Sequence, residues 1–274
     1  MQHYLMKRQK KRKDKPVQAP LPVPCANLKS KEYPPMDLSH RESCHPPDHL
    51  KTDGDATAAG EASFRTFPIG IYNNGFIKPE DIEAFDDEWV FVACPESTYK
   101  CPHCMNHVYH IGCLVVSVCG VLSTTDDIPR SSIGIFFGRQ NKKNLAVELD
   151  GDKHTAQTAE LKACLEALTR VFVLNTNWQI DPPKNNETTY PLHTLVIKTD
   201  SDYVVKGMTE WLPKWKENGW KKSSGHAIAN AELWRIIDAM LKQLEYDMKV
   251  QFWYVPRDKN QIAFNMAKEV LGET

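Results

Sequence analysis

Apolar runs with two different periods alternate along the second half of this chain, and this alternation restricts the fold more than any other feature. Three short runs rich in β-branched residues come first, at residues 113–122, 131–138 and 144–149. Each has the length and composition of a buried strand. Their close spacing in the chain is that of an antiparallel meander, so we predict three consecutive antiparallel strands.

Helices and strands then alternate to the end of the chain. In residues 158–175 apolar side chains recur every three or four positions, which predicts a helix with Thr158 as its N-cap. The order predicts the α/β class: a mixed five-stranded sheet, with the three antiparallel strands first, flanked by helices. The later elements follow from the same spacing, and they are a strand at 194–200, a short helix at 202–207, an amphipathic helix at 230–244, a strand at 250–256 and a final helix around 263–270.

Composition divides the 274 residues into three parts. Residues 1–65 hold many prolines and basic side chains without apolar periodicity, so we expect a disordered tail there. Residues 66–113 form a small segment rich in Cys and His, with a short strand at 88–94. Residues 114–274 carry the α/β pattern and nearly all of the core-forming side chains.

Charge and hydropathy narrow the cellular setting. The formal net charge is −1, so any nucleic-acid-binding surface must be a local one. No apolar leader and no run of about 20 apolar residues is present, so we expect an intracellular protein without membrane association. In that setting the eight cysteines are expected to be thiols or metal ligands. The basic run at 7–15 is typical of a nuclear address or a nucleic-acid-binding arm, or is a solvated tail.

Four local motifs in residues 114–272 stand in a fixed order. They are TAELKACLEAL at 158–168, the TDSDYV turn and W…WKENGWKK segment within 199–225, NAELWRIID at 230–238, and VQFWYVPRDKNQIAFNMAKE at 250–269. Together they resemble the type 1 ribonuclease H family. The resemblance implies the ribonuclease H fold and hydrolysis of the RNA strand of RNA–DNA hybrids. In that family four carboxylates hold the divalent ions, Mg²⁺ or Mn²⁺, that activate water.

Two of the four family carboxylate positions hold acids in this chain. The second matches Glu160 and the third matches Asp200. Without the surrounding motifs, these acids would be read as a first-turn Glu that favours the helix dipole and an Asp helix cap. The first and fourth positions hold Cys119, a soft ligand poorly suited to Mg²⁺, and Phe264, which binds no metal. The resemblance therefore implies an incomplete site with weak or absent cleavage. Acids in nearby predicted loops that could serve as replacements are Asp126, Asp127 and Asp258.

The segment at residues 211–225, which we call the handle, matches the basic handle of the family. Lysines there would contact phosphates and aromatic faces would pack on sugar or base. The alternatives are a solvated lysine face and tryptophans that pack the handle itself. Ala156 and Gln157 stand where the family has an asparagine pair that reads the minor groove of the hybrid, which weakens the expectation of hybrid selectivity. The predicted nucleic-acid contacts are Lys216, Trp220, Lys221, Lys222 and Asn230.

A second candidate metal site lies just before the meander. A Cys-x2-Cys knuckle followed by further Cys and His residues is typical of a tetrahedral Zn²⁺ site. The alternative is a set of free thiols and surface histidines. The predicted ligands are Cys101, Cys104, His110 and Cys113, with Cys94 and His107 as alternates.

Three functions are compatible with these patterns. The first is a nucleic-acid-binding module that has lost nuclease action. The second is an active RNA–DNA hybrid endonuclease with a reorganised metal site, and the third is a scaffold whose Cys/His segment and tail bind another protein. The number of missing carboxylates favours the first. The patterns do not indicate an oligomeric state.

Overall fold

The structure is a computed structural model that describes residues 64–86, 88–102, 105–125, 128–151, 154–180, 192–222 and 224–273. The expected tail therefore lies outside the described residues, except for Phe64 and Arg65. Arg65 is buried, and its Nε lies 2.6 Å from Oε1 of Glu245 at the end of a helix far along the chain. No helix within the described ranges is long and apolar enough to cross a membrane.

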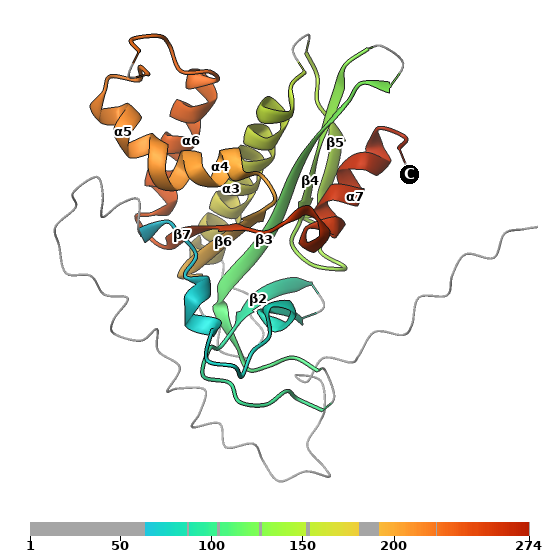
Figure 1. The fold of residues 1–274 in the computed structure, drawn as a ribbon. Coiled ribbons are helices and arrows are strands. Elements are labelled where there is room, and N and C mark those ends of the chain that lie inside the picture. Colours follow the sequence, from blue (N-terminus) through green and yellow to red (C-terminus); the bar gives the residue numbers. More distant parts are fainter. Residues whose placement is uncertain are drawn as a thin grey trace, which may run out of the picture.

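The predicted mixed five-stranded sheet is present. Its first three strands form an antiparallel meander, and the other two run parallel to the first of these. The strands are β3 (Tyr109–Ser123), β4 (Arg130–Phe136), β5 (Leu145–Glu148), β6 (Thr194–Thr199) and β7 (Lys249–Tyr254). Figure 1 shows β3, β4 and β5 side by side, with β6 and β7 crossing the centre of the molecule.

Two further strands make the sheet larger than predicted. β1 (Glu83–Asp86) and β2 (Trp89–Ala93) form an antiparallel pair, and β2 pairs with β3. β3 accommodates this because it is 15 residues long: one edge carries β2 along its first part and β4 along its second. The residues before the meander therefore belong to the same seven-stranded sheet.

The four predicted helices are present, but the first extends to Ile180, beyond its predicted end at 175, and a helix at Leu212–Glu217 was not predicted. The first begins at Ala156, earlier than expected, because Oγ1 of Thr155 accepts the backbone N–H of Thr158 at 3.1 Å. Thr155 therefore caps this helix, and the prediction of Thr158 as the cap was wrong. The helices are α3 (Ala156–Ile180), α4 (Asp202–Lys206), α5 (Leu212–Glu217), α6 (Ala231–Leu244) and α7 (Gln261–Val270), with a π-helical turn at Gly207–Trp211 between α4 and α5.

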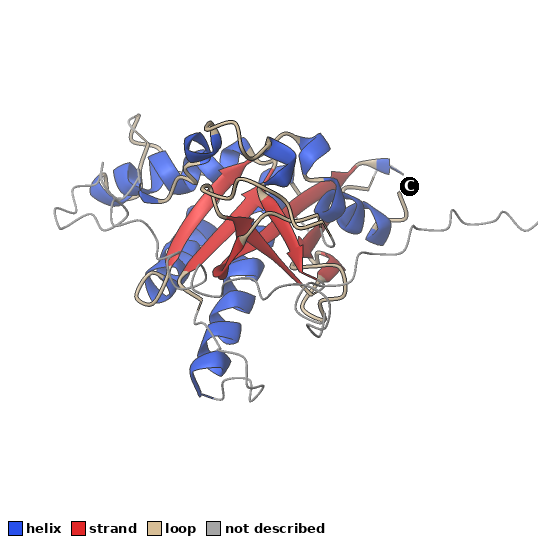
Figure 2. Cartoon of the chain, turned by 90° about the horizontal axis from the view of Figure 1, so that it is seen from below, coloured by secondary structure: helices blue, strands red, loops and turns tan. Residues whose placement is uncertain are grey.

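The sheet buries both of its faces. Side chains of β3 alternate between them, so Val116 and Val118 pack with α3 and α6, whereas Val115 and Cys119 pack with α7. The segment before β1, which contains two short 3-10 turns, lies on the α7 face. Figure 2 shows the strands as a central layer with helices on both sides. Cys119 is thus held inside the core, near the end of its strand.

The segment before β1 is fastened to the sheet at two places. Thr66 pairs in parallel with Phe252, so residues 65–67 cover the outer edge of β7. In addition, Nζ of Lys198 on β6 lies 2.7 and 2.6 Å from the two carboxylate oxygens of Glu83 on β1. Lys198 is buried, and its third hydrogen bond goes to the carbonyl of Lys259 at 3.2 Å. All three ammonium hydrogens therefore have acceptors.

Candidate functional site

The ends of β3 and β6 and the first turn of α3 meet at one edge of the sheet. A Cβ on Gly120 of β3 would lie 2.2 Å from the backbone nitrogen of Glu160, so only glycine allows the helix to approach the strand this closely. Ser201, just after β6, donates a 2.7 Å hydrogen bond from Oγ to Oε2 of Glu160. These contacts bring Glu160 and Asp200 into one site beside Cys119.

The carboxylate of Asp200 is almost completely buried, with 4% of the side chain exposed. Its Oδ2 accepts a 2.6 Å hydrogen bond from Nε of Arg257, and its Oδ1 accepts one of 2.8 Å from Nδ2 of Asn260. The cap of α4 is Ser201, whose Oγ accepts from the backbone N–H of Val204. The reading of Asp200 as a helix cap was therefore wrong, because its two oxygens face the β7–α7 connection instead.

Arg257 and Phe264 fill the remaining side of the site. Cζ of Arg257 lies 4.6 Å from the centroid of the Phe264 ring, and Nζ of Lys268 lies 5.7 Å from the same centroid. Phe264 is partly buried and packs against the core cluster that includes Ala263 and Ala267 of α7. Arg257 was not among the predicted site residues. Its position directly after the Val-Pro of the last motif was the only signal in the sequence that could have singled it out.

The site favours neutral side chains at two positions. Burial, together with the negative charge of Asp200, raises the pKa of the Cys119 thiol, so this group stays protonated at neutral pH. Burial also raises the pKa of Glu160, although the hydrogen bond from Ser201 acts in the opposite direction. Burial acts to lower the pKa of Arg257, but the hydrogen bond and charge of Asp200 outweigh it, so the guanidinium stays charged.

These residues do not fit a hexacoordinate Mg²⁺ ion. Such an ion requires several oxygen ligands near octahedral geometry, and Cys119 and Phe264 supply none. Both oxygens of Asp200 and one of Glu160 already accept hydrogen bonds, which leaves Oε1 of Glu160 and Oδ1 of Asn260 without partners among the described residues. No group of three or more His, Cys, Asp or Glu side chains in the described ranges is arranged to hold a metal ion.

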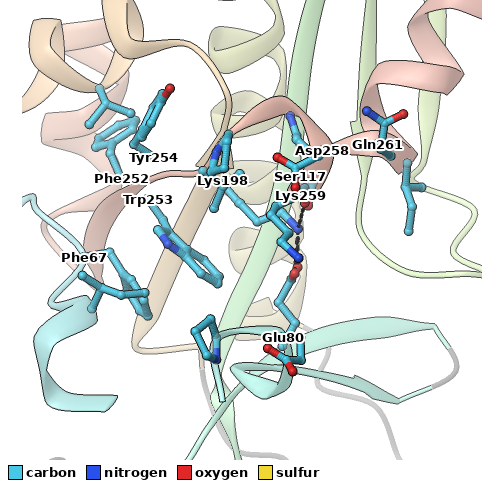
Figure 3. Close-up of a pocket in the computed structure, with 18 of the residues that line it drawn as sticks. Phe67, Glu80, Ser117, Lys198, Phe252, Trp253, Tyr254, Asp258, Lys259 and Gln261 are labelled. Carbon is cyan, nitrogen blue, oxygen red and sulfur yellow. Dashed lines mark hydrogen bonds and ion pairs between the residues drawn. The ribbon is translucent and has the colours of Figure 1, made fainter. Parts of the chain in front are cut away.

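Of the three acids considered as replacement ligands, the structure describes only Asp258, which is not among the residues of this site. Asp126 and Asp127 lie outside the described residues. Asp258 is exposed on the 3-10 turn Arg257–Lys259, and it lines a different cavity. That cavity is a cleft of about 680 Å³ between the segment before β1 and the β7–α7 connection. Figure 3 shows Trp253 beside Phe67, and Glu80 facing Asp258 and Lys259 from the other side of the cleft.

Two tryptophans of the handle, Trp211 and Trp215, pack in a row with Trp234 of α6. Trp234 of α6 is fully buried, and its Nε1 donates a 3.1 Å hydrogen bond to the hydroxyl of Tyr203. The Trp215 ring lies 5.2 Å from that of Trp234, and the Trp211 ring lies 5.7 Å from that of Trp215. Aromatic packing accounts for these side chains, as the alternative reading of the sequence proposed.

The predicted nucleic-acid contacts separate into two groups. Nζ of Lys216 lies 3.5 Å from Oδ1 of the buried Asp238, so this lysine is held by an internal ion pair. Lys221 and Lys222 are exposed on a turn closed by the hydrogen bond from Lys222 N to His226 O. Trp220 and Asn230, the other two predicted contacts, also interact with residues of the protein. Cζ of Arg235 lies 5.0 Å from the centroid of the Trp220 ring, and Asn230 accepts a 3.5 Å hydrogen bond from Thr158 at the start of α3.

Of the four predicted zinc ligands, the structure describes Cys101, His110 and Cys113. Cys104 lies outside the described residues, and Cys101 is in the turn that precedes β3. His110 and Cys113 are both on β3, where Cys113 Sγ lies 3.9 Å from the ring nitrogens of His193, a neighbour that the sequence did not indicate. The two alternates, Cys94 and His107, are both buried. Nδ1 of His107 lies 3.2 Å from Oγ of Ser97.

Comparisons with known proteins place most of this architecture in one family. The sequence profile of the RNase H family matches residues 123–269, more than half of the chain, beginning just after Cys119. Human Ribonuclease H1 is 30% identical over 145 residues, which cover 52% of this chain and 43% of the relative. Ribonuclease H of Bordetella avium (strain 197N) is 54% identical over 52 residues, which cover 19% of this chain and 34% of the relative. The chain thus spans less than half the length of these relatives.

Similar solved structures have been determined as well. One is a foamy viral protease–reverse transcriptase in complex with double-stranded DNA. It is 25% identical, with a TM-score of 0.42, over 57% of this chain and 92% of that one.

Proposed function

The chain belongs to the ribonuclease H family, and we propose that it binds an RNA–DNA hybrid or a related duplex and cleaves it weakly or not at all. The observation that carries this proposal is the state of Asp200. Arg257 and Asn260 occupy both of its oxygens, while Cys119 and Phe264 stand at two of the four family ligand positions. Three of the four carboxylate oxygens that would hold a catalytic ion therefore already accept hydrogen bonds from neighbouring side chains.

Support for duplex binding comes from the handle. Lys221 and Lys222 are exposed and can contact phosphates, and Arg235 stacks on Trp220 next to them along the handle. The hydrogen bond between Thr158 and Asn230 joins the end of the handle region to the first turn of α3, which also carries Glu160. A duplex that contacts the handle would therefore extend toward Asp200.

A labelled RNA–DNA hybrid tests the proposal directly. Retention is measured on a native gel and cleavage on a denaturing gel, each in EDTA, Mg²⁺ and Mn²⁺, with duplex RNA and duplex DNA of the same sequence in parallel. We expect retention in all three buffers and no cleavage above background. The double variant Lys221→Ala, Lys222→Ala should weaken retention and reduce the slope of log K against log salt by about 2, one unit per lost phosphate contact.

The other two functions predict different results. Cleavage that disappears in Asp200→Asn would identify an active endonuclease and overturn the proposal. Absence of both retention and cleavage would leave the protein-binding scaffold. The matched control for the handle is Lys242→Ala, which removes one positive charge at an exposed position on α6 where it pairs with Asp238.

Two further parts of the proposal rest on sequence patterns. The first is nuclear targeting by the basic run at residues 7–15. The second is a structural Zn²⁺ ion held by Cys101, Cys104, His110 and Cys113. Metal analysis of the purified full-length chain tests the second, and less than stoichiometric zinc would remove it.

A further inference from the structure

The geometry points to Arg257 as a phosphate-binding residue: we propose that its guanidinium contacts a backbone phosphate at the place where the family's metal ions would act. The inference rests on the proposed duplex binding and adds a specific contact to it. Nε of Arg257 is bound to Asp200 at 2.6 Å, while 52% of the Arg257 side chain remains exposed. The residue is therefore anchored at one end and open to a ligand at the other.

The donors of this guanidinium are only partly used. A guanidinium carries five N–H groups, and the hydrogen bond to Asp200 uses the one on Nε. Nη1 and Nη2 form no hydrogen bond with any residue that the structure describes. Two N–H groups arranged as a fork match two oxygens of a phosphate, which makes bidentate contact with a phosphodiester favourable.

Stacking holds the guanidinium in a defined plane. The Phe264 ring lies 4.6 Å from Cζ of Arg257, so the side chain is fixed both by its ion pair and by an aromatic face. A side chain already held in place loses less conformational entropy when it binds a ligand. Phe264 thus supports Arg257 at a position where the family has an acid.

The charge balance of the site is also less repulsive to an anion than the family's four carboxylates would be. Four carboxylates alone would repel a phosphate, and a metal ion would be required to reverse this. Here only Glu160 and Asp200 are acidic, whereas Arg257 and Lys268 both lie against Phe264. An arginine stays protonated throughout the ordinary pH range. Phosphate contact at this site is therefore expected without a divalent ion.

The test measures hybrid binding by the full-length chain in EDTA over a series of salt concentrations. We expect Arg257→Ala to weaken binding about tenfold or more, as the loss of a charged hydrogen-bonded contact would. The slope of log K against log salt should fall by about 0.9, which corresponds to one phosphate. Arg257→Lys, which keeps the charge but not the fork, should give an intermediate affinity. Lys242→Ala should bind like the unmodified chain.

A second variant separates phosphate contact from simple unmasking of Asp200. Removing Arg257 also exposes the negative charge of Asp200, which would repel a duplex by itself. The double variant Arg257→Ala, Asp200→Asn removes that charge. If Arg257 contacts the phosphate, the double variant still binds weakly, whereas full recovery of binding would overturn the inference. Thermal unfolding of each variant confirms that it is folded before binding is compared.

Failure of this inference is distinguishable from failure of the proposed function. If Arg257→Ala binds as well as the unmodified chain while the handle double variant is impaired, duplex binding stands and the phosphate contact is rejected. If the unmodified chain retains no duplex at all, both proposals are rejected together.

Discussion

Arg257 donates a hydrogen bond from Nε to Oδ2 of Asp200 at 2.6 Å, although the two residues are 57 positions apart in the chain. The acid is 4% exposed and the base 52% exposed, so a buried carboxylate is neutralised by a guanidinium that reaches in from the surface. A buried carboxylate without a partner is strongly unfavourable. The guanidinium therefore supplies the positive charge that a bound metal ion would otherwise provide to this carboxylate.

This relationship predicts that the unmodified protein is insensitive to Mg²⁺. Its melting temperature should be the same in EDTA and in millimolar Mg²⁺, because both oxygens of Asp200 already accept hydrogen bonds and gain no stability from the ion. Arg257→Ala releases Asp200, and its melting temperature should then rise on addition of Mg²⁺. Differential scanning calorimetry measures both. A clear rise for the unmodified protein would mean that the ion displaces Arg257.

The raised pKa of Glu160 predicts that the stability of the protein depends on pH. Burial raises the pKa of its carboxyl group in the folded state, so folding favours the protonated form. This contribution is fully present below the ordinary glutamate pKa of about 4.3 and is lost as pH rises through the folded-state pKa. Glu160→Gln keeps an oxygen that can accept from Ser201 but does not ionise.

The variant should therefore gain stability over the unmodified chain as pH rises from about 4 to 7. Urea unfolding in EDTA at a series of pH values measures the difference. A difference that stays constant with pH would show that Glu160 titrates normally. One that falls with rising pH would contradict the prediction.

The ion pair between Glu83 and Lys198 predicts that the segment before β3 stabilises the whole sheet. Lys198 is 7% exposed and Glu83 is 18% exposed, so Glu83→Gln leaves a buried ammonium without its counter-ion. We expect a loss of about 3 kcal/mol in the free energy of unfolding, measured by urea denaturation.

The matched control is Asp81→Asn, which breaks the more exposed pair with Lys100 and should cost less than about 1 kcal/mol. Replacing both members of the buried pair, with Glu83→Leu and Lys198→Met, should recover most of the stability. Equal losses for Glu83→Gln and Asp81→Asn would argue against a structural role for the segment.

The close approach of α3 to β3 predicts intolerance of a single methyl group. Gly120→Ala places a Cβ 2.2 Å from the nitrogen of Glu160, against backbone that cannot rotate away. The expected cost is about 3 kcal/mol, with displacement of Glu160 from Ser201. Gly70→Ala, where no atom lies within 4 Å, should change stability by less than about 0.5 kcal/mol. Thermal denaturation compares the two, and similar melting temperatures would count against the packing argument.

Local patterns were sufficient for the five family strands and for most helices. β4 and β6, for example, differ from their predicted ranges by two residues or fewer at each end. The pattern failed at the start of α3, where Thr155 and Thr158 are both acceptable caps and only the packed helix selects between them. It also did not reveal that β1 and β2 join the sheet, because the partner of a strand is decided by contacts between distant residues.

The amino-acid sequence by itself determined the α/β class, the family and the chemical types at the four ligand positions, because periodicity and motif spacing are local properties. Tertiary structure alone decided what happens to Asp200. The hydrogen bonds from Arg257 and Asn260 join residues at the ends of β6 and β7, and these come together only when the two strands pair in parallel. Electrostatic neutralisation depends on distance in space, and spacing along the chain carries little information about it.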